Sequence, residues 1–210
     1  MPHSSLFGPD DLQKSENVSR ETISRLKTYV DLLLTWNKRI NLIAKSTEAD
    51  VWRRHILDSA QLYPLIPQDC LSLTDLGSGA GFPGLVLAIM GVKGVRLVES
   101  DARKAAFLRE ASRITESKAI VLNQRAEAVT SGPVDVVTAR ALAPLADLLT
   151  LAQPFLGPKT TCLFLKGQHI EAELTQAHKM WTISVDSRPS RSDPTGTIVR
   201  VREVSHVKSN

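Results

Sequence analysis

The first 68 residues show helical spacing of apolar positions and no strand-like alternation. Ser19 is placed to cap a helix whose apolar stripe recurs every three or four residues, at Ile23, Leu26, Val30, Leu33 and Trp36. Thr47 is placed to open a second helix, which carries Val51, Trp52, Ile56 and Leu62 and ends at Pro64. We expect both stripes to dock on the rest of the chain. Residues 1–68 are therefore predicted to be a helical cap and not an independent domain.

From Leu71 onward, short apolar runs alternate with longer helical segments. The runs predicted to be strands are Leu71–Leu76, Val95–Val98, Ala119–Leu122, Val134–Thr138, Cys162–Leu165 and Ile183–Val185. The segments predicted to be helices are Pro83–Met90, a stretch with Ala105, Phe107, Leu108, Ala111 and Ile114, then Leu142–Phe155 and Ile170–Trp181. Strands that alternate with helices favour a mostly parallel sheet covered on both faces. Residues 69–210 are predicted to form this main domain.

The C-terminal segment departs from this alternation of strands and helices. The turn-forming residues 190–196 separate the sixth strand from an apolar run over Ile198–Val204, with no helix between them. Strands joined by so short a link must be antiparallel, because a parallel crossover needs about a dozen residues. We therefore predict a Rossmann-like α/β fold: a mostly parallel seven-stranded sheet, an antiparallel C-terminal hairpin and a helical N-terminal cap. This topology is typical of class I methyltransferases that use S-adenosylmethionine, an analogy that concerns the fold alone.

Composition favours a globular cytoplasmic protein. The chain has 210 residues, of which 42% are hydrophobic and 23% charged, and no apolar run approaches the roughly 18 residues of a membrane span. Residues 1–5 carry neither a basic nor an apolar leader segment, which argues against secretion. Cys70 and Cys162 lie far apart in apolar surroundings and are expected to be buried thiols.

A net charge of +4 adds a mild preference for polyanions. The cations gather in two groups: Lys38, Arg39, Lys45, Arg53 and Arg54 near the predicted cap helices, and Arg188, Arg191, Arg200, Arg202 and Lys208 near the C-terminus. Each group taken alone also fits an ordinary solvated surface. Charge therefore permits a nucleic-acid partner without identifying one.

The segment from Asp75 to Gly84 is the richest candidate site. Its glycines allow positive φ and close approach of the backbone to a ligand, and Gly79-x-Gly81-x-x-Gly84 formally matches the dinucleotide fingerprint, a weak signal by itself. A carboxylate at Asp75 would oppose a pyrophosphate, whereas S-adenosylmethionine brings a sulfonium and an ammonium group. The loop therefore favours S-adenosylmethionine, although a tight turn that binds nothing remains an alternative.

Glu99 follows the second predicted strand, about twenty residues beyond the loop. An acid at this spacing can accept from ribose hydroxyls in either cofactor, or simply cap a helix. No cysteine or histidine has metal-ligand spacing, so no metal is expected. The histidines His55, His169, His178 and His206 show no partner pattern and are interpreted as structural or exposed.

Several blocks together resemble one family. They are Trp36-Asn37 with Asn41-Leu42, His55-Ile56-Leu57-Asp58-Ser59, Asp75–Gly84, Arg125-Ala126-Glu127, Thr138-Ala139-Arg140-Ala141 and Lys166-Gly167. With them the chain resembles the RsmG family (glucose-inhibited division protein B), the guanine-N7 methyltransferases of 16S ribosomal RNA. The likeness runs from about Trp36 to Gly167, and residues 1–20 and 170–210 carry little of it.

The resemblance implies a cofactor pocket formed by Gly77, Phe82, Ala126, Glu127 and Arg140, to which the loop and spacing arguments add Gly79 and Glu99. Phe82 could wall the site. Glu127 follows the third predicted strand, where its carboxylate could accept from the exocyclic amine of adenine, although a surface acid is an equal alternative.

The resemblance also implies where the methyl group goes. Amino methyltransferases are similar to one another in carrying an Asp/Asn-Pro-Pro-aromatic motif after the fourth strand, but this chain reads Arg140-Ala141-Leu142-Ala143. Guanine N7 has an exposed lone pair and needs no general base. We therefore expect Arg140 and Lys166 to be the catalytic pair that orients guanine or phosphate, with Arg125 adding positive field. His55 and Asp58 either belong to this site or bridge the cap to the main domain.

The predicted protein is thus a monomeric, cytoplasmic 16S rRNA (guanine-N7)-methyltransferase that uses S-adenosylmethionine and acts on the small ribosomal subunit. Two other readings stay open. A methyltransferase for a small molecule or a protein would lack salt-dependent binding to RNA. A dinucleotide-binding oxidoreductase or nucleotide-binding module would bind NAD in preference to S-adenosylmethionine.

Overall fold

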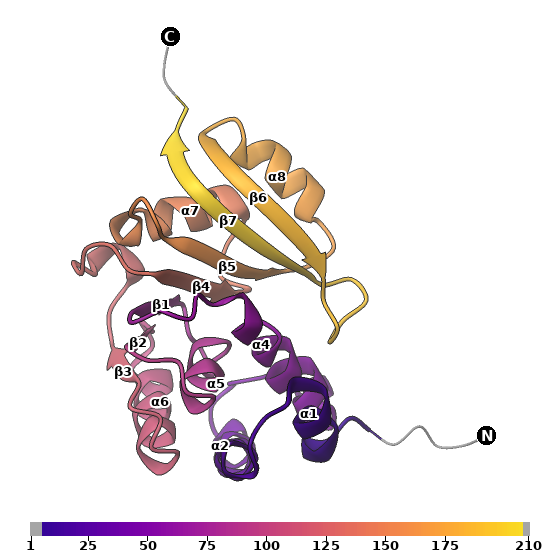
Figure 1. Ribbon diagram of the computed structural model, residues 1–210. Helices are drawn as coiled ribbons and strands as arrows, with labels where there is room; N and C mark the ends of the chain where they lie inside the picture. The colour runs from indigo at the N-terminus through magenta and orange to yellow at the C-terminus, as the bar shows by residue number, and fades with distance from the viewer. Residues whose placement is uncertain (1–5, 208–210) are drawn as a thin grey trace.

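A computed structural model describes residues 6–207 and contains one seven-stranded sheet (Figure 1). The strand order is β3-β2-β1-β4-β5-β7-β6, and β7 is antiparallel to both of its neighbours while the other pairs are parallel. The predicted fold class is therefore confirmed. Residues 1–5 and Lys208, on which parts of the sequence argument rest, lie outside the described residues.

The elements follow the predicted alternation. The strands are β1 (Leu73–Leu76), β2 (Val95–Val98), β3 (Ile120–Leu122), β4 (Val136–Arg140), β5 (Thr161–Lys166), β6 (Trp181–Pro189) and β7 (Thr197–His206). The α-helices are α1 (Pro9–Glu16), α2 (Arg20–Asn37), α3 (Lys45–Glu48), α4 (Asp58–Ala60), α5 (Gly84–Ile89), α6 (Ala102–Ile114), α7 (Leu145–Ala152) and α8 (Ile170–Ala177). A π-helical segment, η1 (Trp52–Leu57), leads into α4, and short 3-10 turns are η2 (Tyr63–Leu65), η3 (Ala126–Ala128) and η4 (Gln153–Phe155).

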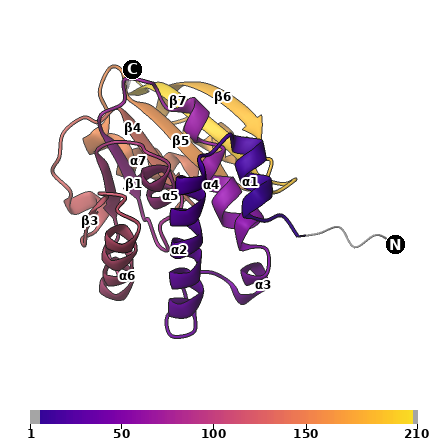
Figure 2. The same cartoon turned by 60° about the horizontal axis from the view of Figure 1, so that its bottom comes forward.

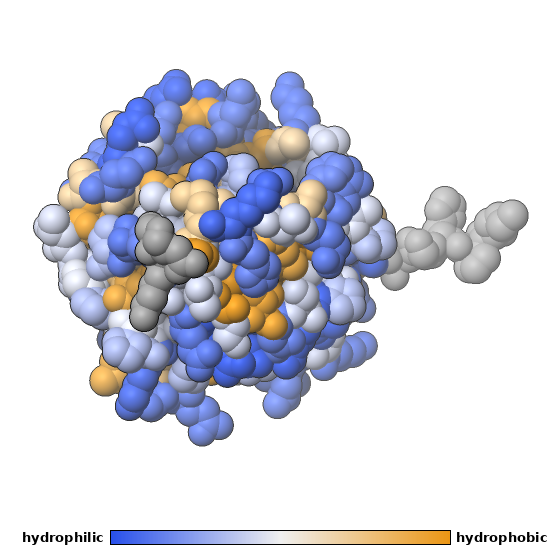
Figure 3. All heavy atoms as spheres, turned by 90° about the horizontal axis from the view of Figure 1, so that it is seen from above, coloured by the Kyte–Doolittle hydropathy of each residue, from blue (hydrophilic) through white to orange (hydrophobic). Residues whose placement is uncertain are grey.

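Helices cover the two faces of the sheet unequally. The cap helices, α5 and α6 pack on one face, and α7 and α8 pack on the other (Figure 1). Figure 2 shows α2 running beside α5 and α6. Seen from above in Figure 3, the surface is mostly hydrophilic, with smaller groups of hydrophobic residues between the hydrophilic ones. Within residues 6–207, no helix is both long and apolar enough to cross a membrane.

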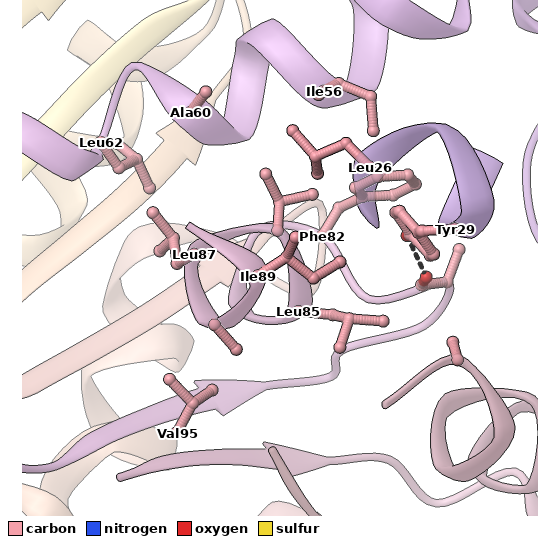
Figure 4. Close-up of a cluster of buried hydrophobic side chains, with 14 of the residues drawn as sticks. Leu26, Tyr29, Ile56, Ala60, Leu62, Phe82, Leu85, Leu87, Ile89 and Val95 are labelled. Carbon is pink, nitrogen blue, oxygen red and sulfur yellow. Dashed lines mark hydrogen bonds between the residues drawn. The ribbon is translucent and has the colours of Figure 1, made fainter. Parts of the chain in front are cut away.

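The cap is joined to the main domain by a continuous apolar cluster (Figure 4). Leu26 and Ile56 from the cap pack against residues of α5, and Tyr29 lies edge-on to Phe82 with ring centroids 5.7 Å apart. The Tyr29 hydroxyl donates to the carbonyl oxygen of Ala80 in the glycine loop. The cap helices therefore pack against the glycine loop and hold it in place. This packing is expected, because an amphipathic helix must bury its apolar face against another part of the protein.

Most element positions agree with the sequence, and the deviations have local causes. The Ser19 cap is confirmed, since its hydroxyl accepts from the Thr22 N–H. The helix expected from Thr47 is wrong in its start, because α3 begins at Lys45 and a π-helical segment follows. The predicted end of a helix at Trp181 is also wrong, since Trp181 is buried as the first residue of β6 and stacks on His206.

Candidate functional site

The glycine loop connects β1 to α5 with backbone angles that favour glycine. Gly77, Gly79 and Gly81 have φ values of 63°, 56° and 103°. At Gly84 the helix lies directly on the strand, since an added Cβ would stand 2.5 Å from the Asp75 Cβ. The loop can therefore turn sharply and still bring backbone to a ligand.

Asp75 lies beneath this loop and does not face a ligand. Its side chain is fully buried in β1, where Oδ1 accepts from the Thr138 hydroxyl at 2.7 Å. Burial raises the pKa of Asp75 to about 6, against the lowering effect of its hydrogen bonds and of Arg140. The argument that an acid at the loop's mouth repels a pyrophosphate is therefore wrong, because Asp75 does not reach the mouth.

This burial predicts a pH-dependent stability. Folded Asp75 keeps its proton up to about pH 6, whereas the unfolded side chain loses it near pH 3.8, so its favourable contribution is full below about pH 3 and is lost as pH rises through about 6. Asp75→Asn keeps an acceptor for Thr138 and cannot ionise. From pH 4 to pH 8, wild type should lose ~2.5 kcal/mol of unfolding free energy relative to this variant, measured by urea titration. A difference that stays constant with pH would contradict the assignment.

Glu99 is the acid that meets the loop. It stands just after β2, is 7% exposed, and accepts from the Gly79 N–H at 2.8 Å and the Asp101 N–H at 2.7 Å. The carboxylate thus holds the loop against the sheet edge. Each carboxylate oxygen has further acceptor capacity, so binding a ribose hydroxyl is compatible with this structural role.

A cavity of about 320 Å³ opens above the loop, and we call it the cofactor cavity. Five of the predicted cofactor residues line it: Gly77, Gly79, Glu99, Ala126 and Glu127. Its volume is at the lower end of the ~300–1,000 Å³ usual for small-molecule sites. Positive-φ glycines under an open space, with Glu99 and Glu127 as acceptors and Lys104 and Arg125 as cations at the wall, fit a nucleoside-containing ligand that carries charges of both signs, as S-adenosylmethionine does.

The other two predicted cofactor residues lie outside this cavity. The Phe82 side chain is buried between the cap and the loop (Figure 4). The His55 ring stacks on it with ring centroids 5.0 Å apart. The Arg140 guanidinium lies over the same Phe82 ring, 4.6 Å from its centroid. Phe82 therefore supports Arg140 through its side chain, and a contact between either residue and the cofactor stays a prediction.

Arg140 lines a second cavity of about 580 Å³, which we call the Arg140 cavity. The carboxyl ends of β4 and β5, the η1–α4 segment, and the turn between β6 and β7 form its walls. Ala141 and Leu142 line both cavities, so they form the partition between them. Ala141 has a φ of 51°, and the Leu142 side chain covers Gly77, where an added Cβ would lie 2.6 Å from Leu142 Cδ1.

The cations of the Arg140 cavity are each paired with an acid of the same cavity. Arg140 Nη1 lies 3.3 Å from Asp58 Oδ2. Arg54 Nη1 lies 2.6 Å from an oxygen of Asp193, and Lys166 Nζ lies 2.6 Å from an oxygen of Glu173. The three lining cations and three lining acids cancel. A cavity with no net charge suits an uncharged base better than a phosphate.

Lys166 is held more firmly than a substrate-binding lysine would need. Its side chain is 8% exposed, and Nζ also donates to the Ala143 carbonyl oxygen at 2.8 Å. The ammonium therefore links the end of β5 to α8 and to the partition segment. Its contact with substrate stays a prediction.

His55 and Asp58 do connect the cap to the main domain. Asp58 Oδ1 accepts from the Ser192 hydroxyl at 2.6 Å, in the turn between β6 and β7. The His55 ring crosses to the main domain by stacking on Phe82, and its Nε2 is held within the cap, 2.8 Å from the Thr47 hydroxyl. Burial, followed by the charges of Arg140 and Arg54, lowers the pKa of His55 to about 3. The ring is therefore neutral at physiological pH, and the predicted bridge is present.

Sequence reasoning missed several residues of this cavity, among them Glu173, Ser190, Ser192 and Asp193. The serines lie in a turn whose only sequence signal was its composition, and Glu173 lies on a helix outside the region of family resemblance.

Among residues 6–207 there is no cluster of three or more potential metal ligands.

Comparison with known proteins shows to which family the chain is similar. Residues 22–192 match the family described as rRNA small subunit methyltransferase G. The chain is 54% identical over 199 residues to ribosomal RNA small subunit methyltransferase G of Paramagnetospirillum magneticum, covering 95% of this chain and 97% of that one. It is 55% identical over 196 residues to the protein of the same name from Rhodospirillum rubrum, covering 93% and 98%.

Solved structures of lower identity share the fold. An O-methyltransferase from Bacillus cereus in complex with SAH aligns with a TM-score of 0.62 at 11% identity, over 93% of this chain and 96% of that one. A ribosomal protein L11 methylase from Lactobacillus delbrueckii aligns with a TM-score of 0.56 at 18% identity, over 68% and 77%. At such identities the likeness concerns the architecture alone.

Proposed function

Because the chain belongs to the family of rRNA small subunit methyltransferase G, we propose that it transfers a methyl group from S-adenosylmethionine to N7 of a guanine in 16S ribosomal RNA. The observation that carries the proposal is the pair of adjoining cavities. One holds the glycine loop and two acids, the other is electroneutral, and Ala141 and Leu142 separate them.

The residues of the cofactor cavity would bind and orient the methyl donor. Gly77 and Gly79 would contact it through backbone, Glu99 would accept from its ribose, and Glu127 would accept from the adenine amine. S-adenosylmethionine supplies an electrophilic methyl carbon on a sulfonium. In the proposed reaction the N7 lone pair would form the N–C bond while the C–S electron pair returned to sulfur, and the positive charge would pass to the guanine ring.

The Arg140 cavity would hold the guanine and exclude water. N7 carries no proton, so the reaction requires alignment and no general base. The surroundings agree with this, because His55, with a pKa of about 3, is a poor proton acceptor at neutral pH. Arg140, which lines this cavity, would donate to guanine O6 next to the reacting nitrogen and would thereby orient N7 toward the partition.

Contacts with the RNA backbone would come from cations around these cavities. Arg125 and Lys104 line the cofactor cavity, and within residues 6–207 neither forms an ion pair. Such cations can contact phosphates and make binding weaken with salt. Both cavities are built from one chain, so we further propose that the protein acts as a monomer, in the cytoplasm, where ribosomal RNA is its substrate.

The test is a methyl-transfer assay on small-subunit particles and on naked 16S RNA lacking the modification. We expect methyl incorporation at a single guanine, with N7-methylguanosine revealed by chain cleavage after borohydride reduction and aniline treatment. Incorporation at an exocyclic amine or at carbon would overturn the assignment to N7. Binding of NAD in place of S-adenosylmethionine in a calorimetric titration would instead favour an oxidoreductase.

A further inference from the structure

The acids of the Arg140 cavity differ in how fully their oxygens are used. Both oxygens of Asp58 are engaged, since Oδ1 accepts from Ser192 and Gln61 and Oδ2 faces Arg140. Both oxygens of Asp193 are engaged as well, Oδ1 by Thr195 and Oδ2 by the Arg54 guanidinium. Neither acid has an oxygen left without a donor.

Glu173 on α8 is arranged differently. Its Oε2 accepts from the Leu145 N–H at 2.7 Å and lies 2.6 Å from Lys166 Nζ, so two donors occupy one oxygen. Within residues 6–207, no hydrogen bond reaches its Oε1. The side chain is 22% exposed and lines the Arg140 cavity. Two contacts therefore fix the carboxylate and leave one oxygen with its full acceptor capacity.

Guanine has an edge that matches this oxygen. N7 and O6 are acceptors on one side of the base, whereas N1–H and the exocyclic N2 amine are neighbouring donors on the Watson–Crick side. If N7 faces the partition at Ala141 and Leu142, the donor edge points away from the cofactor cavity. Among the carboxylate oxygens of this cavity, Glu173 Oε1 is the one that no donor of the described residues occupies, and it is therefore the acceptor most readily available to that edge.

Building on the proposed function, we propose that Glu173 is the residue that selects guanine, by accepting hydrogen bonds from N1–H and the N2 amine. Lys166 is then a positioning residue, which orients this carboxylate and the partition segment. The arrangement also rejects adenine, because adenine presents the lone pair of N1 to the same oxygen, and two acceptors repel. The choice of guanine over adenine thus combines hydrogen bonds that only guanine can donate with a repulsion that only adenine meets.

The same contact would assist the reaction itself. Methyl transfer makes the guanine ring cationic, and a fixed carboxylate at the ring edge stabilises that charge as it develops. Because Lys166 and Leu145 already orient the carboxylate, it needs no rearrangement when the charge appears. Glu173 therefore acts on kcat for guanine as well as on the choice of base.

The experiment compares guanine with inosine, which lacks only the N2 amine, at the target position of a synthetic RNA. Wild type should prefer guanine in kcat/KM by about 10- to 100-fold, as expected for loss of one hydrogen bond to a charged group. In Glu173→Gln, the amide oxygen must face Lys166 and the Leu145 N–H, so the amide NH₂ faces the base. This variant should lose at least tenfold in kcat/KM on guanine, and its preference over inosine should fall to within about threefold.

Glu171→Gln is the matched control, because it removes the same charge from an exposed position in the first turn of the same helix. It should keep the wild-type preference. Structural damage would lower the rates for both bases equally, so an unchanged preference in Glu173→Gln would overturn the inference. The proposed function fails separately, if wild type forms no N7-methylguanosine on the guanine RNA.

Discussion

Replacing Arg140 by alanine is expected to lower kcat by about 100-fold, with less than a threefold change in the dissociation constant of S-adenosylmethionine. The Arg140 guanidinium lies over the Phe82 ring, is paired with Asp58 and lines the cavity beside the partition. Its donors would fix guanine O6 and thereby the direction of N7. Loss of one pre-oriented donor at a reacting group costs ~10²- to 10³-fold in rate. Single-turnover methyl transfer and calorimetric titration of the cofactor measure the two quantities.

Two further variants make this result interpretable. Arg140→Lys keeps the charge but loses the planar fork that matches both Phe82 and Asp58, so it should recover only part of the rate. Arg113→Ala removes an arginine from the exposed face of α6, outside both cavities, and should leave kcat unchanged. The thermal unfolding midpoint should be measured for each variant, to show that the protein is folded. Turnover near the wild-type level in a folded Arg140→Ala protein would refute the role.

The architecture could be predicted from sequence because it is set by local periodicity. Alternation of short apolar runs with helices specifies the parallel sheet, and the short link at 190–196 specifies the antiparallel hairpin. The helix α1 was missed for the same reason, since Leu12 is its only buried residue and it carries no apolar stripe. Elements without periodicity give no such signal.

The sequence allowed many residues of the site to be predicted, but not which side chains contact one another within it. Candidates at strand ends, such as Glu99 and Lys166, do gather at the carboxyl edge of the sheet, as parallel topology requires. The pairing of Arg140 with Asp58 joins positions 82 residues apart, and no local pattern encodes it. The burial of Asp75 was missed because strand position alone does not say to which face a side chain points.

Replacing Gly79 by valine is expected to weaken S-adenosylmethionine binding by at least 100-fold. An added Cβ at Gly79 would meet only the Gly77 carbonyl oxygen, 3.8 Å away, so it points into the cofactor cavity and not into the protein. A branched side chain there would occupy part of a space of about 320 Å³. Isothermal titration with S-adenosylmethionine measures the loss.

Backbone strain could also weaken binding in this variant, because Gly79 has a φ of 56°. A branched residue at such a φ destabilises the fold by ~1–2 kcal/mol, whether or not it lies near a ligand. Gly132 separates strain from obstruction. Its φ is 69°, an added Cβ would meet nothing within 4 Å, and it does not line the cofactor cavity. Gly132→Val should therefore lose similar stability to Gly79→Val while binding the cofactor like wild type. If both valine variants bound S-adenosylmethionine equally well, the cavity above the glycine loop would not be where the methyl donor sits, and the assignments that depend on its position beside Arg140 would have to be abandoned.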